Sequence, residues 1–322
     1  MPCADADDAA AGNPASNPAS NSGSSPGSAA PADSAASTPP PAAGAVRLIC
    51  RWASAPLKTM PGGRAEMASQ ILRGEQAEKL EEVALPPHSR ERGWLRVRLL
   101  HDGYEGYAPR EAFDLAPDTP PSHVVCVPQT LLFPQADIKS APTQPLFMGA
   151  LLHAAGVPVA GRGTSGHFLP LQEGGFVFAA HVHRLGDTMP ADAAGMAEML
   201  LHAPYLWGGR TMAGIDCSGL VQLALTMAGQ RNVPRDSGPQ AEQVGEALPL
   251  SWLQAPERLQ RGDLVFWKGH VAMLLDEHTI IHANAHHMQV ATEPLQAAVE
   301  RIARSGGGEP TALRRLPATA AA

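Results

Sequence analysis

One cysteine and two histidines in the last third of the chain have the types and spacing needed for nucleophilic catalysis. Cys217 lies between a Gly-rich loop, residues 207–214, and an apolar stretch that predicts a helix over residues 216–229. Free backbone N–H groups and the helix dipole favour an anion at such a position, so we expect a lowered thiol pKa. His270 and His282 lie on neighbouring predicted strands, about two positions from facing each other. The three residues could therefore supply a nucleophile, a base and an orienting group.

Each of these residues also has an ordinary structural explanation. A lone cysteine at a helix start is more often a small buried residue, and a histidine at a strand start is more often polar surface. Four further histidines, His181, His183, His286 and His287, could be taken for a metal cluster, but they lack an ordered ligand spacing. We therefore expect no metal and no organic cofactor.

The elements expected to position these side chains are a helix followed by short strands. Strands are predicted over residues 264–267, 270–275 and 279–282, and turn residues separate them. Such a series favours an antiparallel meander. A helix followed by antiparallel strands indicates an α+β domain.

The order of the motifs in this region is more specific than any of them alone. They are Asp216-Cys217-Ser218-Gly219, Arg261-Gly262-Asp263-Leu264-Val265-Phe266, Gly269-His270-Val271-Ala272 and Ile281-His282-Ala283. From about residue 189 to 303 the chain resembles the NlpC-type peptidases, a family of papain-like cysteine peptidases. The resemblance implies that Cys217 is the nucleophile, His270 the base and His282 the third polar residue, with Tyr205 beside the cleft.

The region before this domain predicts short strands and Gly-rich turns. Residues 46–50 and 94–99 alternate with a period near two, as half-buried strands do. Residues 69–75 and 103–109 are similar to the bacterial SH3-like barrels fused to one branch of the NlpC-type family. Residues 118–187 repeat this pattern of short strands and Gly-rich turns and are assigned as a second barrel by position. The alternative is one larger irregular β domain.

The branch that the barrels resemble consists of γ-D-glutamyl-L-diamino acid endopeptidases, which cut the stem peptides of peptidoglycan. In that branch the barrels restrict the cleft, so the implied substrate is a short muropeptide with a free N-terminal L-alanine, as in cell-wall recycling. The resemblance implies substrate contacts by Tyr205, Asp216, Ser218, Asp236, Ser237, Glu75 and Tyr107. Two alternatives remain at this point: an amidase or acyltransferase on the same papain-like core, and a noncatalytic wall-binding protein that uses its SH3-like barrels.

Composition sets the remaining limits. The 322 residues carry a net charge of -7 without a Lys/Arg cluster, which argues against a nucleic-acid partner. No signal sequence or apolar run of membrane-spanning length is recognised, and the four cysteines are widely spaced, so we expect a cytoplasmic protein without membrane insertion. The predicted organisation is a disordered low-complexity tail (1–45), barrel 1 (46–117), barrel 2 (118–187), the peptidase domain (188–305) and a C-terminal tail (306–322).

Overall fold

The computed structural model describes residues 44–84, 93–188 and 192–316. The low-complexity tail predicted for residues 1–45 lies outside the described residues except for its last two positions. Within the described ranges, the chain forms three groups of elements in sequence order, and each has a hydrophobic core of its own.

The first group is a seven-stranded antiparallel sheet. Its strands are β1 (Arg47–Cys50), β2 (Ser54–Lys58), β3 (Met67–Leu72), β4 (Gln76–Val83), β5 (Trp94–Leu99), β6 (Glu105–Pro109) and β7 (Phe113–Leu115), paired in the order β3-β2-β6-β5-β4-β1-β7. Alternate residues of β5, among them Leu95, Val97 and Leu99, are buried in one cluster. The predicted strand and its inward face are therefore confirmed, and this group is the SH3-like domain.

The second group contains shorter strands in two sheets. They are β8 (His123–Val125), β9 (Gln129–Phe133), β10 (Gln144–Phe147), β11 (Leu151–Leu152), β12 (Val159–Ala160), β13 (His167–Pro170), β14 (Phe176–Phe178) and β15 (Val182–Arg184), ordered β10-β9-β14-β13-β12 and β11-β8-β15. Val125, Leu146 and Val177 lie in its core. That this group is a second copy of the barrel stays a prediction.

The third group combines helices with a six-stranded antiparallel sheet. Its elements are α1 (Ala193–Glu198), β16 (Arg210–Thr211), β17 (Gly214–Ile215), α2 (Cys217–Met227), α3 (Ser237–Gln243), β18 (Glu246–Leu248), β19 (Leu264–Trp267), β20 (His270–Leu274), β21 (Thr279–Asn284), β22 (Gln289–Pro294), α4 (Leu295–Arg304) and β23 (Ala312–Arg315). The sheet order is β18-β23-β19-β20-β21-β22. The predicted meander β19-β20-β21 and the α+β class are thus confirmed.

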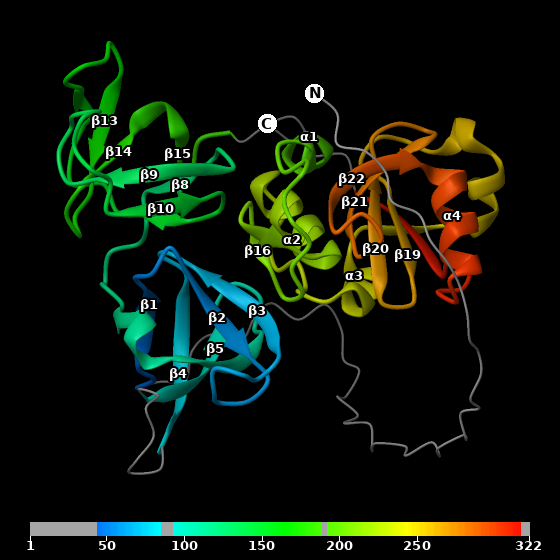
Figure 1. Ribbon diagram of the computed structural model, residues 1–322, viewed down its shortest axis with the longest axis horizontal. Coiled ribbons are helices and arrows are strands. Elements are labelled where there is room, and N and C mark those ends of the chain that lie inside the picture. The colour runs from blue at the N-terminus through cyan, green and yellow to red at the C-terminus, as the bar shows by residue number, and fades with distance from the viewer. Residues whose placement is uncertain (1–43, 85–92, 189–191, 317–322) are drawn as a thin grey trace, which may run out of the picture. The chain divides into compact units, whose positions relative to one another are not determined.

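The six-stranded sheet is covered on both faces, as Figure 1 shows for α2 on one side and α4 on the other. Phe266, Val271 and Ile281 pack with α1 and α2, whereas the alternate residues of the same strands pack with α4. Because side chains alternate along a strand, a residue two positions from Ile280 in β21 faces α4. His282 occupies that position.

The C-terminal tail predicted from residue 306 is wrong over its described part. β23 pairs with β19 through Val265 and Leu313 and with β18 on its other side, so it completes the sheet. Leu313 is the one buried residue of this strand. In a segment of four residues, one buried apolar side chain is too little to show the alternation of apolar and polar residues that predicts a strand.

Candidate active site

Cys217 is the first residue of α2 and lies against the sheet. Asp216 caps the helix by accepting a hydrogen bond from the backbone N–H of Gly219 at 2.7 Å. The thiol of Cys217 is near the backbone N–H groups of Val271 and Ser218. Val271 directly follows His270, so the thiol of Cys217 lies beside the start of the strand that carries the candidate base. The described residues include no hydrogen bond from the thiol to either imidazole, and such contacts commonly tighten only when substrate is bound.

The thiol does not have the low pKa expected from the helix terminus. Burial raises the pKa of Cys217 to about 11, and the charge of Asp216 adds to the rise, while the two backbone N–H groups oppose it. Burial also lowers the pKa of His270 to about 3, with a further contribution from His282. The expected lowering of the thiol pKa is therefore wrong, because desolvation of this 7%-exposed residue outweighs the effect of the backbone N–H groups of Val271 and Ser218. The resting pair is a neutral thiol and a neutral imidazole.

His270 and His282 are joined as the sequence predicted. The β20–β21 register pairs Met273 with Ile281 and so places His282 two positions from the residue opposite His270. Nε2 of His270 and Nδ1 of His282 are 2.9 Å apart. This contact fixes the orientation of the His270 ring and leaves its Nδ1 as the atom able to accept a proton.

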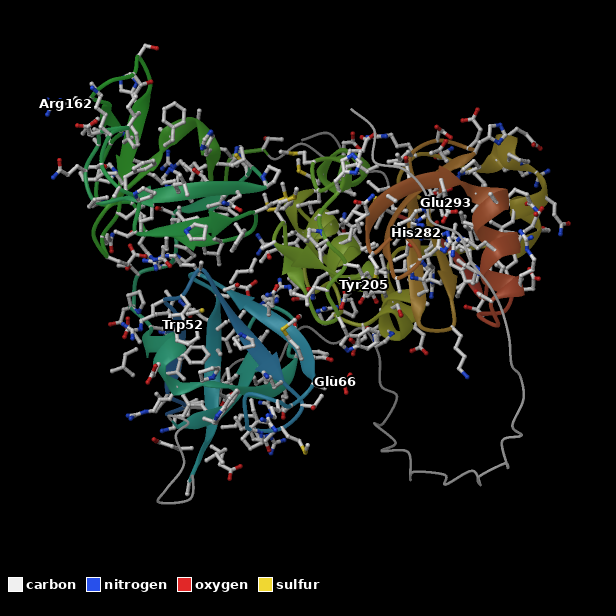
Figure 2. The ribbon with its side chains drawn as sticks, in the orientation of Figure 1. Trp52, Glu66, Arg162, Tyr205, His282 and Glu293 are labelled. Atoms are coloured by element: carbon white, nitrogen blue, oxygen red, sulfur yellow. The ribbon has the colours of Figure 1, made fainter. Side chains whose placement is uncertain are left out.

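The chain of contacts continues to two residues that the sequence analysis did not identify. Nε2 of His282 is 2.8 Å from Oε1 of Glu293 in β22, and Glu293 forms a close ion pair with Arg301 of α4. Figure 2 labels His282 and Glu293, which come from neighbouring strands of the sheet. In the structure, Ala291 pairs with His282. Glu293 is two residues further along β22, so its side chain lies on the same face of the sheet as that of His282.

Three side chains near this chain of contacts could hold a metal ion. One ligand atom each from His282, His287 and Glu293 lie within 4.8 Å of one another. A divalent ion there would compete with Arg301, which already supplies a positive charge to Glu293. The Nδ1 atom of His287 is also 3.0 Å from Oδ1 of Asn284.

Asp216 and Ser218, both predicted to contact substrate, are engaged within the protein. Arg235 is buried and donates to Asp216 Oδ2 at 2.7 Å and to Ser218 Oγ at 2.9 Å. Asp216 also accepts from the N–H of Gly208 at 2.8 Å. Gly208 has φ +75°, and a Cβ there would lie 2.6 Å from the carbonyl oxygen of Met67, so the loop before Cys217 requires glycine at this point. These contacts position Cys217, the candidate nucleophile.

Glu75, another predicted substrate contact, forms a buried ion pair with the third group of elements. Its oxygens accept from Arg210 Nη1 at 2.9 Å and Nη2 at 3.0 Å, and Oε2 also accepts from the N–H of Leu72. The side chains of Arg210 and Glu75 are 3% and 8% exposed. Both carboxylate oxygens are therefore occupied by the protein itself.

Asp236 lies open beside a tyrosine of the SH3-like domain. The hydroxyl of Tyr104 is 3.1 Å from Asp236 Oδ2. The pKa of Asp236 is raised, mainly by desolvation and further by the charges of Asp216 and Asp102, which indicates a place where a cation would be favourable. Tyr104, not the predicted Tyr107, makes this contact, although both belong to the same Gly-punctuated sequence.

The remaining predicted contacts lie around α3 and the loop before Cys217. Ser237 is the first residue of α3, directly after Asp236. Tyr205, labelled in Figure 2, has a pKa raised to about 12 by burial and, in second place, by the charge of Cys217. The structure thus brings Tyr205 near the nucleophile. Tyr107 makes no side-chain hydrogen bond with the described residues and remains a predicted contact only.

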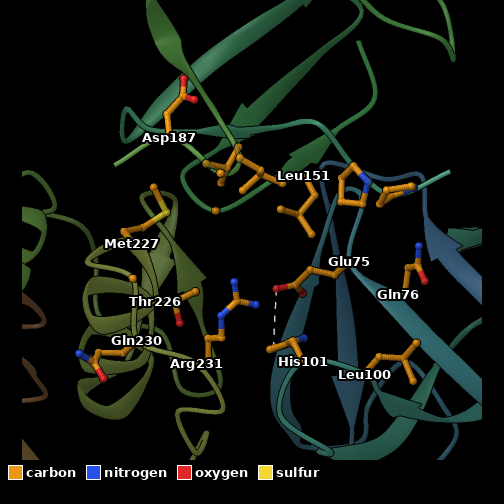
Figure 3. Close-up of a pocket in the computed structure, with 18 of the residues that line it drawn as sticks. Glu75, Gln76, Leu100, His101, Leu151, Asp187, Thr226, Met227, Gln230 and Arg231 are labelled. Carbon is orange, nitrogen blue, oxygen red and sulfur yellow. Dashed lines mark ion pairs between the residues drawn. The ribbon is translucent and has the colours of Figure 1, made fainter. Parts of the chain in front are cut away.

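A cavity of about 1030 Å³ lies at the other end of α2. Figure 3 shows Glu75, His101 and Leu151 on its walls together with Thr226 and Arg231. Cys217 and Thr226 are separated by nine residues of helix, or about 14 Å at 1.5 Å per residue. The cavity is therefore distinct from the cysteine–histidine site, with Glu75 as the one predicted site residue that lines it.

Residues 202–301, which contain Cys217, His270 and His282, match the NlpC/P60 family, and residues 59–113 match the bacterial dipeptidyl-peptidase SH3 domain. The fold and site thus define a protein in which an SH3-like domain and a second group of short strands precede an α+β domain with the cysteine and histidines. The chain carries an NlpC/P60 domain. The part of the chain that the structure describes contains no helix with the length and apolarity to cross a membrane.

Three known proteins illustrate the similarity. The chain is 27% identical to dipeptidyl-peptidase 6 of Lysinibacillus sphaericus over 70% of its own length and 82% of that protein. It is 36% identical to the γ-D-glutamyl-L-lysine dipeptidyl-peptidase of Bacillus cereus over 35% of each chain. The crystal structure of an NlpC/P60 family protein from B. cereus ATCC 10987 superposes with a TM-score of 0.65 at 21% identity, covering 84% of this chain and all of that one. That likeness establishes a shared fold.

Proposed function

We propose that this protein is a cysteine endopeptidase that hydrolyses the bond between γ-D-glutamate and a diamino acid in peptidoglycan stem peptides. The observation that carries the proposal is the connected site in which Cys217 begins α2 beside the strand of His270, and His270 contacts His282 at 2.9 Å. The names of the γ-D-glutamyl-L-lysine dipeptidyl-peptidase relatives from two Bacillus species support a bond of this kind.

The chemistry follows from a neutral thiol beside a neutral base. As the sulfur of Cys217 attacks the γ-glutamyl carbonyl carbon, His270 accepts the thiol proton. The backbone N–H of Cys217 at the helix start stabilises the oxyanion. His270 then gives the proton to the departing amine, and it later activates the water that hydrolyses the thioester. His282 keeps the His270 ring in the productive orientation.

Substrate selection rests on the open carboxylate of Asp236 and the Tyr104 hydroxyl beside it. An N-terminal L-alanine amine is a cation and requires acceptors when it leaves water. We propose that Asp236 binds this amine and that Ser237 and Tyr205 line the same cleft. Intact wall, in which that amine is blocked as an amide, would then be a poor substrate, and short free muropeptides would be preferred.

A defined substrate tests the proposal. The protein is incubated with L-Ala-γ-D-Glu-diaminopimelate and with the N-acetylated form of the same tripeptide, and products are identified by mass. Free tripeptide should yield L-Ala-γ-D-Glu and diaminopimelate. Acetylation removes the cation that Asp236 would bind and should cost about 1 kcal/mol in kcat/KM, the scale of an exposed charge pair. Equal cleavage of both forms would refute the amine-binding part of the proposal.

The same experiment separates the other candidate functions. An acyltransferase on this core requires an added amine or alcohol acceptor, whereas a peptidase releases a new amine in water alone. A noncatalytic wall-binding protein would be retained on insoluble sacculi without turnover. Asp236→Asn, with the exposed Asp276→Asn as control, should narrow the preference for the free tripeptide. Unchanged preference in Asp236→Asn would place the amine elsewhere.

A further inference from the structure

A carboxylate lies beside Nε2 of His282, on the edge of the ring that points away from His270. His282 is 1% exposed, and its Nε2 lies 2.8 Å from Oε1 of Glu293. Among the described residues, the Glu293 carboxylate is the partner within hydrogen-bond distance of Nε2. Glu293 is therefore the acidic group close enough to decide whether Nε2 carries a proton.

The ionisation of Glu293 is set by its other neighbour. The carboxylate is paired with Arg301, and its side chain is 12% exposed. The adjacent guanidinium of Arg301 stabilises the carboxylate form of Glu293. An ionised carboxylate only accepts hydrogen bonds. A lone pair on Nε2 at 2.8 Å would repel it, so Nε2 must carry the hydrogen.

The hydrogen on Nε2 of His282 determines which ring nitrogen of His270 carries a hydrogen. His282 is 1% exposed, and burial favours the neutral ring, which has one N–H. With the hydrogen on Nε2, Nδ1 of His282 is an acceptor, and His270 must donate to it from its own Nε2. The Nδ1 atom of His270 then keeps its lone pair, which is what a base for the Cys217 thiol requires.

We infer that Glu293, held by Arg301, is a positioning residue that fixes the tautomers of His282 and His270 and so keeps His270 in the form that can accept the thiol proton. This inference rests on the proposed function for its kinetic test, but the tautomer itself can be measured without any substrate. Glu293 on the edge strand β22 and Arg301 on α4 would thus act in a reaction that takes place at the start of α2.

Glu293→Gln is the sharpest substitution. Its amide oxygen is attracted to the donors of Arg301, which turns its NH₂ group toward His282 and favours a lone pair on Nε2. That arrangement moves the hydrogen of His282 to Nδ1 and reverses the polarity of the His282–His270 contact. We expect kcat/KM on the free tripeptide to fall about 10- to 100-fold, the usual range for losing an outer partner of a functional histidine.

A double-mutant cycle distinguishes positioning from general structural support. Because Glu293 acts through His282, Glu293→Gln should cost less than about twofold once His282 is already glutamine. Glu300→Gln on α4, an exposed carboxylate paired with Arg304, is the matched control and should leave kcat/KM unchanged. An equal loss from Glu293→Gln in both backgrounds, or no loss in the wild-type background, would overturn the inference.

Imidazole nitrogen NMR on histidine-labelled wild-type protein at pH 7 is the second measurement. The spectrum of His282→Gln identifies the His282 resonances by their disappearance. We expect a protonated Nε2 and an unprotonated Nδ1 for His282, and this readout decides the matter even if Glu293→Gln does not fold. The charged groups that face His282 are Glu293, Arg301 and His287. A protonated Nδ1 would overturn the inference, whereas the expected tautomer in a protein that cleaves no tripeptide would refute the proposed function alone.

Discussion

Replacing Glu75 by glutamine is expected to destabilise the protein because it strands a buried guanidinium. Arg210 loses its anionic partner at a place where both side chains are under 10% exposed. Its remaining hydrogen-bond acceptor is the carbonyl oxygen of Gln70, 2.9 Å from Nη1, and the buried carboxylate of Asp102 acts on it only at longer range. The glutamine can still accept from the N–H of Leu72, so the change isolates the charge.

Removing one partner of a buried ion pair typically costs about 3–5 kcal/mol. We use the lower figure of about 3 kcal/mol because the Gln70 carbonyl is retained. At about 2–4 °C per kcal/mol for units of this size, the melting temperature at pH 7 should fall by about 6–12 °C. Circular dichroism during a thermal scan measures the change. The double variant Glu75→Gln, Arg210→Met removes the stranded cation and should recover most of the loss.

The control is an exposed pair in the same domain. Lys79 and Glu82 are 2.7 Å apart with side chains 30% and 47% exposed, and such pairs contribute about 0–1 kcal/mol. Glu82→Gln should therefore shift the melting temperature by less than about 4 °C. If Glu75→Gln melts like the wild type and instead loses its preference for free over acetylated tripeptide, the carboxylate is available to substrate and the reasoning from the ion pair is refuted.

Three further predictions concern the cysteine–histidine site. Cys217→Ala should abolish turnover and leave the melting temperature within a few degrees, because the lost volume is small; residual cleavage with alanine at this position would exclude the thiol mechanism. His270→Ala should remove nearly as much activity, and His282→Asn less, since an amide can still orient a ring; a comparison of kcat/KM ranks them. Because the pKa of His270 is lowered, this base stays unprotonated as pH falls, so the acid limb of kcat/KM should lie below pH 6.5; a limb above that value would contradict the buried neutral imidazole.

Local patterns were sufficient for the elements that carry the nucleophile and the base. Asp216 is a strong capping residue and Gly229 adopts φ +89° after α2, so the limits of this helix could be predicted from neighbouring residues alone. The strands β19, β20 and β21 are short apolar runs between turn residues, and their pairing follows from the turn lengths.

Properties that depend on distant partners could not be read in the same way. The pKa of Cys217 reflects burial by the whole fold, whereas the sequence displays only the favourable helix start. Glu293 reaches His282 only in one register of β21 and β22, and its charge depends on Arg301 in a later helix. The family resemblance predicts Glu75 as a substrate contact, whereas its carboxylate forms an ion pair that joins segments 135 positions apart.

The contacts of Arg210 and Arg235 make the SH3-like domain part of the internal support of the nucleophile. Arg235 Nε donates to Ser69 at 3.0 Å while its other nitrogens hold the helix cap, and the backbone N–H of Arg210 donates to the Gln70 side chain at 2.7 Å. A catalytic domain released from its barrel would lose the partners of two buried arginines. Exchange of barrels between relatives is therefore constrained, and Ser69, Gln70 and Glu75 should vary together with these two arginines during evolution.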